Sequence, residues 1–448
     1  MPKILRPEGP KGRWLIGVTP LTSGDRLKAM TDWAREYGDI YHCRFLGYHV
    51  YFLNRPEYIE QVLVTHQRKF MKGRALQANR ELFGNGLLTS EGDFWQRQRK
   101  LSQPAFHRAR IQSYAKTMVD CTVRAMEGWR AGEERDIHQD MMALTLDIAA
   151  RTLFSVEIGA MGARIRDALE ELLEVSARPE RILKPLRVVS WRSEGKYRRA
   201  IAELDKIVYG IIAERRASGR DTGDLLSMLL AARDDEGKGM SDQQLRDELL
   251  TLLLAGHETT ALALSWTWYL LANHPEAEKL LHQEVDAAFA GAAPRVEDLP
   301  RLPYTEKVVK EALRLYPPAY VILRLALEPV EIAGYALPAG SSVGMSPWVV
   351  HHDARYFPEP EKFLPERWTE SFAQKLPRFA YFPFGGGPRI CIGAQFAMME
   401  AVLVLATIAS RYRLGVAAGH KIELFPSITL RPKNGIRAKV ETRGAVLN

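Results

Sequence analysis

The sequence predicts a mainly α-helical fold with a smaller β portion. Two observations support this class: apolar residues recur at three- and four-residue spacing over most of the 448 residues, and strand signals are few. The composition, 46% hydrophobic and 26% charged, is ordinary for a globular protein and excludes a disordered chain. Nine Trp, 16 Tyr and 16 Phe are enough to line a large apolar cavity.

The expected elements follow from these patterns. Helical periodicity covers 55–65, 91–104, 109–130, 138–156, 161–177, 195–217, 242–273, 275–290, 303–315 and 392–411. Alternation predicts one hairpin that pairs Tyr41–Phe45 with His49–Leu53, and another that pairs Val330–Ala333 with Ser342–Met345. Because there is no repeat, low-complexity tract or linker, we expect a single domain over 1–448. Its β-rich parts are expected at 38–55, 320–350 and 414–442.

Charge and cysteine content limit the location and the partners. The net charge of +8 is a mild bias, which suits an acidic protein partner at least as well as a nucleic acid, and no nucleic-acid recognition motif is present. Three cysteines, Cys43, Cys121 and Cys391, are an odd and sparse set that favours a reducing compartment. The apolar run Trp14–Val18 is too short for a signal-peptide core or a membrane span. We therefore expect a cytoplasmic protein without a membrane anchor.

One expected helix is unusually long. Ser241 and Gln244 have the spacing of a capping box, and Pro275 ends the pattern. The residues from Asp242 to Asn273 would span about 48 Å as a helix. Since this helix is apolar on most sides, it should run through the core.

The sequence AGHETT at 255–260 interrupts this helix near its middle. Gly256 removes a side chain, so that another group can approach the backbone, and Glu258 is costly in a dry core unless it is paired. Two interpretations stay open. The segment is either a kink with one satisfied polar cluster, or a groove in which Glu258 and Thr259 deliver protons to a buried site.

Glu311 and Arg314 lie three residues apart on the helix expected at 303–315. A surface pair of this kind contributes little, whereas a buried bidentate pair fixes geometry. Arg367 follows in the next polar segment and offers a second guanidinium to Glu311. The Glu-x-x-Arg spacing is common by chance and is weak by itself.

The segment 382–393, FPFGGGPRICIG, carries the decisive cysteine. Cys391 precedes a helical pattern, and a helix N-terminus favours a thiolate. A structural buried cysteine is the simplest alternative, and a Cys–His hydrolase stays open. A zinc site is disfavoured because no second Cys or His lies at ligand spacing. The rigid, glycine-lined loop with an arginine best suits a large metallated ring.

This loop resembles the heme-binding signature of the cytochrome P450 family, Phe-Gly-x-Gly-x-Arg-x-Cys-x-Gly, at Phe384, Gly385, Gly387, Arg389, Cys391 and Gly393. The other signals follow in the order of that family. Segment 255–260 resembles its oxygen-activation segment, Trp95 and Arg99 match its Trp-x-x-x-Arg pair, and Arg324 resembles a second propionate ligand.

The resemblance implies the cytochrome P450 fold, with a long central helix over a heme and a cysteine loop beneath it. It implies heme b (iron protoporphyrin IX), with the iron bound by the thiolate of Cys391. The other implied cofactor-binding residues are Arg389, Trp95, Arg99, Arg324, Phe384, Gly385, Ala255 and Gly256. Glu258 and Thr259 are the implied catalytic residues, and the implied structural triad is Glu311, Arg314 and Arg367.

The implied activity is that of a monooxygenase, which inserts one atom of O2 into a hydrophobic small molecule. The motifs resemble those of soluble bacterial members that act on fatty acids, terpenoids and carotenoids, and a steroid-like substrate is also compatible. We expect a monomer that takes electrons from a separate ferredoxin or flavodoxin. Five basic residues and no acid between Arg97 and Arg110 indicate a docking face for that acidic partner, with a solvated charged face as the alternative.

Other functions stay open at this point. A heme-thiolate peroxygenase or an isomerase would need no reductase, and a heme sensor would need an output module. We expect a variable lid within 158–195. The expected pocket residues, each equally compatible with plain core, are Leu82, Phe83, Leu87, Leu88, Leu252, Val321, Ile322 and Ile428.

Overall fold

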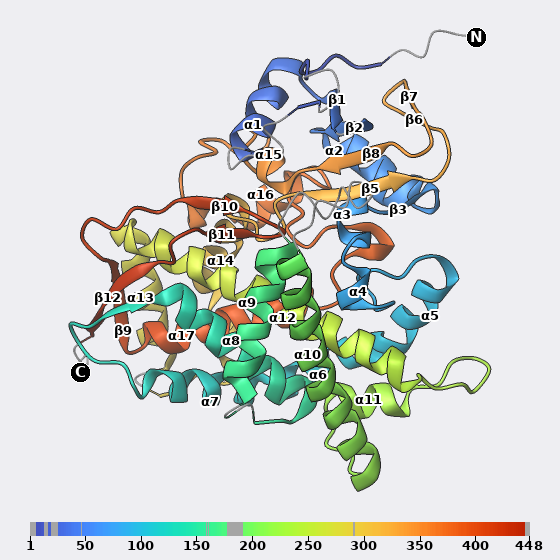
Figure 1. The fold of residues 1–448 in the computed structure, drawn as a ribbon. Helices are drawn as coiled ribbons and strands as arrows, with labels where there is room; N and C mark the ends of the chain where they lie inside the picture. Colours follow the sequence, from blue (N-terminus) through green and yellow to red (C-terminus); the bar gives the residue numbers. More distant parts are fainter. Residues whose placement is uncertain are drawn as a thin grey trace.

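The computed structural model describes residues 6–12, 17–18, 26–45, 47–157, 159, 161–176, 191–289 and 292–443. Most of this part is helical, and one group of strands lies to one side of the helices (Figure 1). This arrangement confirms the mainly α class with a smaller β portion.

Periodicity located the long helices to within about one turn. They are α5 (Gly92–Ser102), α8 (Ile137–Phe154), α9 (Met161–Ser176), α10 (Trp191–Ser218), α12 (Asp242–Ala272), α13 (Pro275–Phe289), α14 (Pro303–Leu315) and α17 (Ala394–Ala409). The predicted helix at 109–130 is two helices, α6 (Arg108–Ser113) and α7 (Ala115–Met126), and the one at 55–65 is α2 (Pro56–Glu60) continued by a π-helical segment, Gln61–Thr65. Shorter helices had no clear periodic signal: α1 (Arg26–Tyr37), α3 (Arg74–Gln77), α4 (Arg80–Phe83), α11 (Leu225–Ala231), α15 (Pro347–His351) and α16 (Glu370–Lys375).

The largest sheet joins segments that are far apart in the sequence. Its strand order is β1 (Ile40–Phe45), β2 (Tyr48–Leu53), β8 (Ser342–Met345), β5 (Ile322–Ala326) and β3 (Phe70–Lys72). The first predicted hairpin is confirmed, because β1 and β2 pair antiparallel with Phe45 opposite Tyr48. Elsewhere, β12 (Arg437–Thr442) lies between β4 (Glu134–Asp136) and β9 (Tyr412–Val416), and β10 (Leu424–Pro426) pairs with β11 (Leu430–Pro432).

The second predicted hairpin is wrong. Val330–Ile332, which is β6, pairs with β7 (Tyr335–Leu337), whereas β8 pairs with β5 and β2. Ala333 and Gly334 have φ values of +55° and +79°, which is the backbone of a tight two-residue hairpin turn. The chain therefore reverses at Ala333–Gly334, before the glycine-containing turn at 337–340 that the sequence suggested.

Helix α12 lies at the centre of the helical part (Figure 1) and packs against α8, α10, α14 and α17. Ser241 caps it, because its hydroxyl accepts a hydrogen bond from the Gln244 N–H at 3.2 Å. The side chain of Gln244 turns instead to Glu248 and the Asn85 carbonyl, so the capping box is only half formed. The prediction that this helix crosses the core is confirmed, since most of its residues are buried.

Candidate functional site

The cysteine loop is held in a backbone shape that depends on glycine. The N–H of Cys391 donates to the Phe384 carbonyl oxygen at 3.0 Å, which closes the loop. Gly385 and Gly387 have φ values of +72° and +67°, where other residues are strained. A Cβ atom on Gly387 would lie 1.9 Å from the Leu63 carbonyl oxygen, so the loop packs tightly against the N-terminal part of the chain.

The side chain of Cys391 is accessible, although protein atoms surround it closely enough to desolvate it. This burial raises the pKa of the Cys391 thiol, and the Gly393 N–H, Arg99 and Lys72 oppose the rise. The helix terminus therefore favours the thiolate as expected, but the desolvation is larger. An exposed cysteine whose thiol is closely surrounded by protein atoms suits a metal ligand, because coordination deprotonates a thiol outright.

Beside the Cys391 thiol lies a cluster of three basic side chains, Lys72, Arg324 and Arg389. Lys72 on β3 and Arg324 on β5 are directly opposite each other, which is unfavourable for like charges. Burial lowers the pKa of Lys72 well below its usual value, and Arg324 and Arg389 lower it further. Burial, followed by Arg389, lowers the pKa of Arg324 to about 10. Among the described residues Glu91 is the carboxylate that pairs with this cluster, through Arg389, so the cluster keeps a surplus of positive charge.

Two further predicted residues join the same region. The Arg389 guanidinium lies over the Trp95 ring, 4.0 Å from its centroid, and donates to the Ser90 carbonyl at 2.8 Å. Arg99 donates through Nη1 to the Ile390 carbonyl at 2.9 Å, next to the thiol. The structure therefore brings together Cys391, Arg389, Trp95, Arg99 and Arg324. Lys72 belongs to the same cluster and was missed, because only its pairing across the sheet reveals it.

A short stretch of α12 is partly exposed on one face of the helix, which we call its open face. Ala255 is exposed, and Gly256 and Thr259 are half-buried, whereas their neighbours are buried. A Cβ atom on Gly256 would meet nothing within 4 Å, so space lies in front of it. The Thr259 hydroxyl donates to the Ala255 carbonyl oxygen one turn earlier at 2.6 Å, a kind of bond that tends to bend a helix.

Glu258 is buried and bound to the C-terminal hairpin. Its Oε1 accepts from the Thr429 hydroxyl at 2.5 Å and from Arg431 Nε at 2.8 Å. The buried carboxylate is thus paired, as the sequence requires. The hairpin residues Thr429 and Arg431 gave no local signal, because they are more than 170 positions away.

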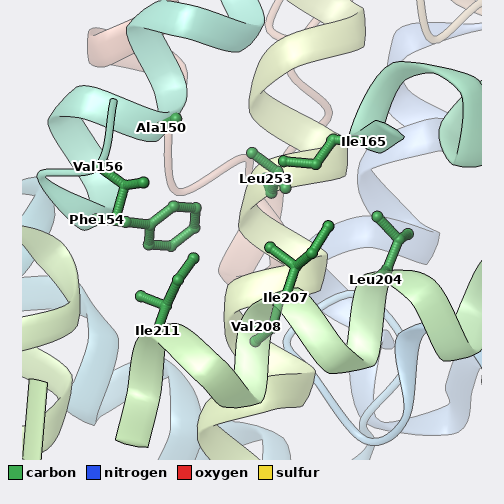
Figure 2. Close-up of a pocket in the computed structure, with 9 residues that line it drawn as sticks. All are labelled: Ala150, Phe154, Val156, Ile165, Leu204, Ile207, Val208, Ile211 and Leu253. Atoms are coloured by element: carbon green, nitrogen blue, oxygen red, sulfur yellow. The ribbon is translucent and has the colours of Figure 1, made fainter. Parts of the chain in front are cut away.

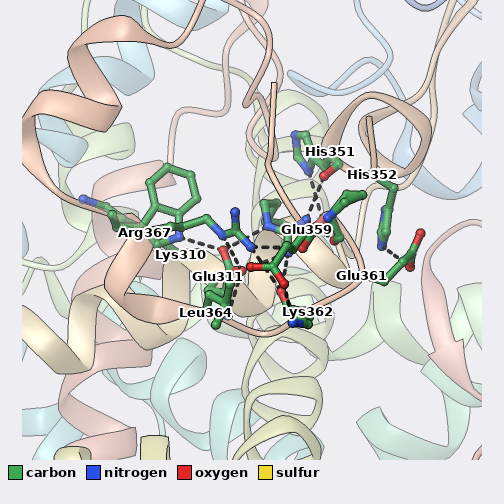
Figure 3. A network of polar contacts seen from close by, with 12 residues as sticks. Lys310, Glu311, His351, His352, Glu359, Glu361, Lys362, Leu364 and Arg367 are labelled. Atoms are coloured by element: carbon green, nitrogen blue, oxygen red, sulfur yellow. Dashed lines mark hydrogen bonds and ion pairs between the residues drawn. The ribbon is translucent and has the colours of Figure 1, made fainter. Parts of the chain in front are cut away.

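The predicted triad forms a buried network (Figure 3). Arg314 binds Glu311 through two parallel bonds of 2.8 and 2.9 Å, and Arg367 Nε donates to the same carboxylate at 2.9 Å. Trp368 adds a bond from Nε1 at 2.9 Å. His351, also missed, connects this network to the cysteine loop: its Nε2 accepts from the Phe382 N–H at 3.0 Å, and its Nδ1 lies 3.3 Å from the Arg314 carbonyl.

The geometry agrees with a family assignment made on the sequence. The family model described as Cytochrome P450 matches residues 7–439. This chain belongs to the cytochrome P450 family. The fold prediction is confirmed by a crystal structure of a cytochrome P450DA heme domain, which superposes with a TM-score of 0.90 over 98% of both chains at 26% identity.

Related P450 enzymes come from Streptomyces. Cyclooctatin synthase of Streptomyces melanosporofaciens is 42% identical over 88% of this chain and 87% of its own. Cyclooctat-9-en-7-ol 5-monooxygenase of the same organism is 39% identical over 92% of each chain. Pentalenene oxygenase of Streptomyces avermitilis is 33% identical over 91% of each chain. The present P450 is accordingly an oxidoreductase of the monooxygenase class with a heme-iron cofactor.

The residues present fit a heme. The surplus positive charge of Lys72, Arg324 and Arg389 suits two propionate groups, and the accessible Cys391 sulfur suits the iron. Within the described ranges no cluster of three or more His, Cys, Asp or Glu is placed to hold a metal ion.

Some of the basic residues between 97 and 110 form ion pairs within the protein, which the sequence did not indicate. Arg97 pairs with Asp234 at 2.7 Å and Lys100 with Asp235 at 2.6 Å, so the loop between α11 and α12 neutralises both. Arg108 is exposed and has no ion pair recorded within the described part of the chain. The exposed positive charge that no carboxylate of the described residues neutralises thus lies closer to α6 than the sequence indicated.

One apolar cavity lies among α8, α9, α10 and α12 (Figure 2). Its volume of about 20 Å³ holds at most one water, so it is a packing void and not a substrate site. Its lining contains none of the expected pocket residues, of which Leu82 and Leu252 lie in the adjoining hydrophobic core. Residues 158, 160 and 177–190 of the expected lid lie outside the described residues. Every helix in the described ranges is too short or too polar to cross a bilayer.

Proposed function

We propose that this P450 hydroxylates a terpenoid-like hydrophobic molecule with heme b bound at Cys391. The observation that carries the proposal is that the exposed Cys391 adjoins the Lys72–Arg324–Arg389 cluster. When bound, the heme supplies O2 activation and oxygen transfer to an unactivated C–H bond. The chain supplies binding, orientation and protons.

Each predicted residue has a proposed task. Arg389, Arg324, Lys72 and Trp95 hold the propionates, Arg99 lies on the side of the sulfur, and Phe384 and Gly385 shape the loop. The open face at Ala255 and Gly256 leaves room for substrate and cofactor. Thr259 and Glu258 hold and pass protons, and the paired Glu258 is positioned by Arg431.

The proposed substrate class follows the names of the relatives. Three relatives of 33% to 42% identity are named for cyclooctatin, cyclooctat-9-en-7-ol and pentalenene. A fatty acid, carotenoid or steroid-like molecule remains within the same apolar class. Among the expected pocket residues, Ile322 borders Gly385 of the cysteine loop and Leu87 lies against Glu248 of α12. Ile428 is exposed.

Electrons are proposed to come from a separate ferredoxin or flavodoxin to a monomeric enzyme. The loop residue next to the sulfur, Ile390, is 43% exposed, and Arg99 lies against it. Arg108 adds positive charge close by, because Phe106, two residues earlier, borders Gly393. A cytoplasmic location is supported by the free thiols of Cys43 and Cys121, which a reducing compartment maintains.

The reduced, CO-bound spectrum tests the proposal. A strongly red-shifted Soret band is expected for the purified holoenzyme and not for Cys391→Ala, with Cys121→Ala as a control that keeps the band. An intact holoenzyme without this band would contradict thiolate ligation. Turnover of cyclic terpenes with and without a reductase system separates a monooxygenase from a peroxygenase or an isomerase.

A further inference from the structure

Three consecutive charged residues of α12, Arg246, Asp247 and Glu248, lie in the core two turns before its open face. Their exposed fractions are 3%, 3% and 0%. Buried charges persist in a fold when partners satisfy them, and the partners reveal what the charges hold. None of these three residues is needed for the tasks proposed above.

The backbone partners of the two carboxylates belong to the segment between α4 and α5. Asp247 Oδ2 accepts from the Asn85 N–H at 2.8 Å, and Glu248 Oε2 accepts from the Leu87 N–H at 2.9 Å. Arg246 donates to the Leu82 carbonyl at 2.9 Å and pairs with Asp205 of α10. Helix α12 therefore binds backbone atoms of this segment, so these hydrogen bonds do not depend on the segment's side chains.

Two glycines allow this close contact. A Cβ atom on Gly84, whose φ is +54°, would lie 2.0 Å from Asp247 Oδ1. A Cβ atom on Gly86 would lie 2.3 Å from the Thr251 hydroxyl and 2.5 Å from the Asp247 carbonyl oxygen. The segment thus lies directly on α12.

The far end of the segment reaches the cofactor-binding cluster. Arg389 donates to the Ser90 carbonyl and pairs with Glu91, and Glu91 also accepts from the Lys72 N–H at 2.7 Å. The segment therefore extends from α12 to the cysteine loop and connects the two halves of the site.

We propose that Asp247 and Glu248 are positioning residues that hold segment 84–89 against α12 as one wall of the substrate pocket, and that this segment detaches more readily when Glu248 ionises. The inference rests on the proposed function, because it concerns the pocket of the same site.

The environment of Glu248 determines whether a rise in pH favours or opposes detachment of segment 84–89. Burial raises its pKa to about 7, with Asp247 adding to the rise and the Leu87 N–H and Gln244 opposing it. The other charged groups nearby are Arg246 and Asp205, while residues 82–89 contribute only backbone groups and no titratable side chain. In water a glutamic acid titrates near pH 4.3. Opening the segment hydrates Glu248 and restores that value, so a rise in pH favours the open state.

Hydrogen–deuterium exchange of the holoenzyme tests the attachment. After correction for intrinsic exchange, protection of the 84–89 amides is expected to fall by about tenfold between pH 6 and pH 8 in the wild type. In Glu248→Gln this dependence should vanish, whereas Glu400→Gln, a buried carboxyl on α17, should keep it. A flat wild-type profile, or a slope retained in Glu248→Gln, would overturn the proposal.

Gly86→Ala provides an independent variant, because its new Cβ collides with Thr251. It should lower protection of the segment at pH 6 towards the wild-type value at pH 8. Unchanged protection would refute close packing on α12.

Ligand binding tests the role as a pocket wall. Fluconazole, which does not titrate between pH 6 and 8, should bind the wild-type holoenzyme more weakly at pH 8, and equally at both pH values in Glu248→Gln. Unsubstituted 1,2,4-triazole, too small to reach the wall, should show no such change. Equal pH responses for both probes would refute the wall. A missing red-shifted CO band in the same samples would instead contradict the proposed function. The exchange experiment would still test whether Glu248 holds segment 84–89 against α12.

Discussion

At the scale of single residues, Glu258 shows how a costly group is accommodated beside an open site. Its carboxylate is almost fully buried, and one hairpin, β10–β11, supplies both the Arg431 ion pair and the Thr429 hydroxyl. The neighbouring Thr259 faces the open side of α12. Adjacent positions of the helix thus carry a buried, paired acid and a partly exposed alcohol.

Arg431→Met is expected to destabilise the protein by about 3 kcal/mol, because it leaves Glu258 as an unpaired buried charge. The double variant Glu258→Gln/Arg431→Met should recover much of this loss, since no buried charge is left. Urea unfolding of the two single variants and the double variant measures the coupling. Additive losses would show that the pair does not interact.

Glu400→Gln is expected to stabilise the protein at neutral pH. Glu400 on α17 is 1% exposed, its Oε1 has no hydrogen-bond partner, and burial raises its pKa well above the usual value. Below about pH 4.3 both folded and unfolded chains carry the proton. Above it the unfolded chain ionises first, so wild-type stability falls by up to about 1.4 kcal/mol per pH unit.

Unfolding midpoints of the wild type and Glu400→Gln should therefore coincide near pH 4 and diverge as the pH rises. A constant difference across this range would mean that the carboxyl is ionised in the folded protein. Glu306→Gln, on the exposed side of α14, provides the comparison for a partly solvated carboxyl.

Local sequence was sufficient for residues whose role is set by near neighbours. The spacing around Cys391 and the pair Glu311–Arg314 predicted which residues meet in space. Lys72 and Arg431 could not be predicted, because their partners depend on sheet pairing and on a distant hairpin. The same reason explains why Asp234 neutralises Arg97 without a sequence signal.

At the scale of elements, long helices were predictable and short connections were not. The 31 residues of α12 carry a periodic pattern too long to be accidental, and Ser241 defines its start. The β6–β7 hairpin was missed because its turn places a non-glycine residue, Ala333, at positive φ. Propensity disfavours that conformation, and tertiary context imposes it.

Ala333→Asn is expected to stabilise the fold by roughly 0.5–1 kcal/mol, because Asn-Gly suits the two left-handed turn positions. Ala336→Asn, in the adjacent strand β7, should be neutral or destabilising. Thermal midpoints of the two variants provide the comparison. A loss of stability in Ala333→Asn would show that the turn is not strained at this position.

At the scale of the whole molecule, one hydrophobic cluster includes residues from Ile111 to Val440 and contains parts of α7, α8, α12, α14 and α17. We propose on this basis that the chain folds as a single domain. Its strands and helices meet at the site, since the Cys391 loop packs on the π-helical segment at Leu63 and continues into α17.

The distribution of charge predicts how the molecule meets a redox partner. Arg108→Glu should slow reduction by an acidic ferredoxin severalfold at low ionic strength, because steering by an exposed charge governs association. Arg97→Gln should have a smaller effect, since Asp234 already neutralises Arg97. Stopped-flow reduction at two salt concentrations measures both. Equal effects of the two substitutions would place the docking face elsewhere.

The contact between Gly387 and the Leu63 carbonyl also has a consequence for biosynthesis. Leu63, Lys72 and Glu91 leave the ribosome early, whereas Arg324, Arg389 and Cys391 emerge only when most of the polypeptide has been translated. A nascent chain cannot assemble this contact before then. With Cys391 as the proposed iron ligand, we expect heme to bind only after most of the chain has been translated, and ribosome-stalled fragments that end before residue 391 should not retain heme.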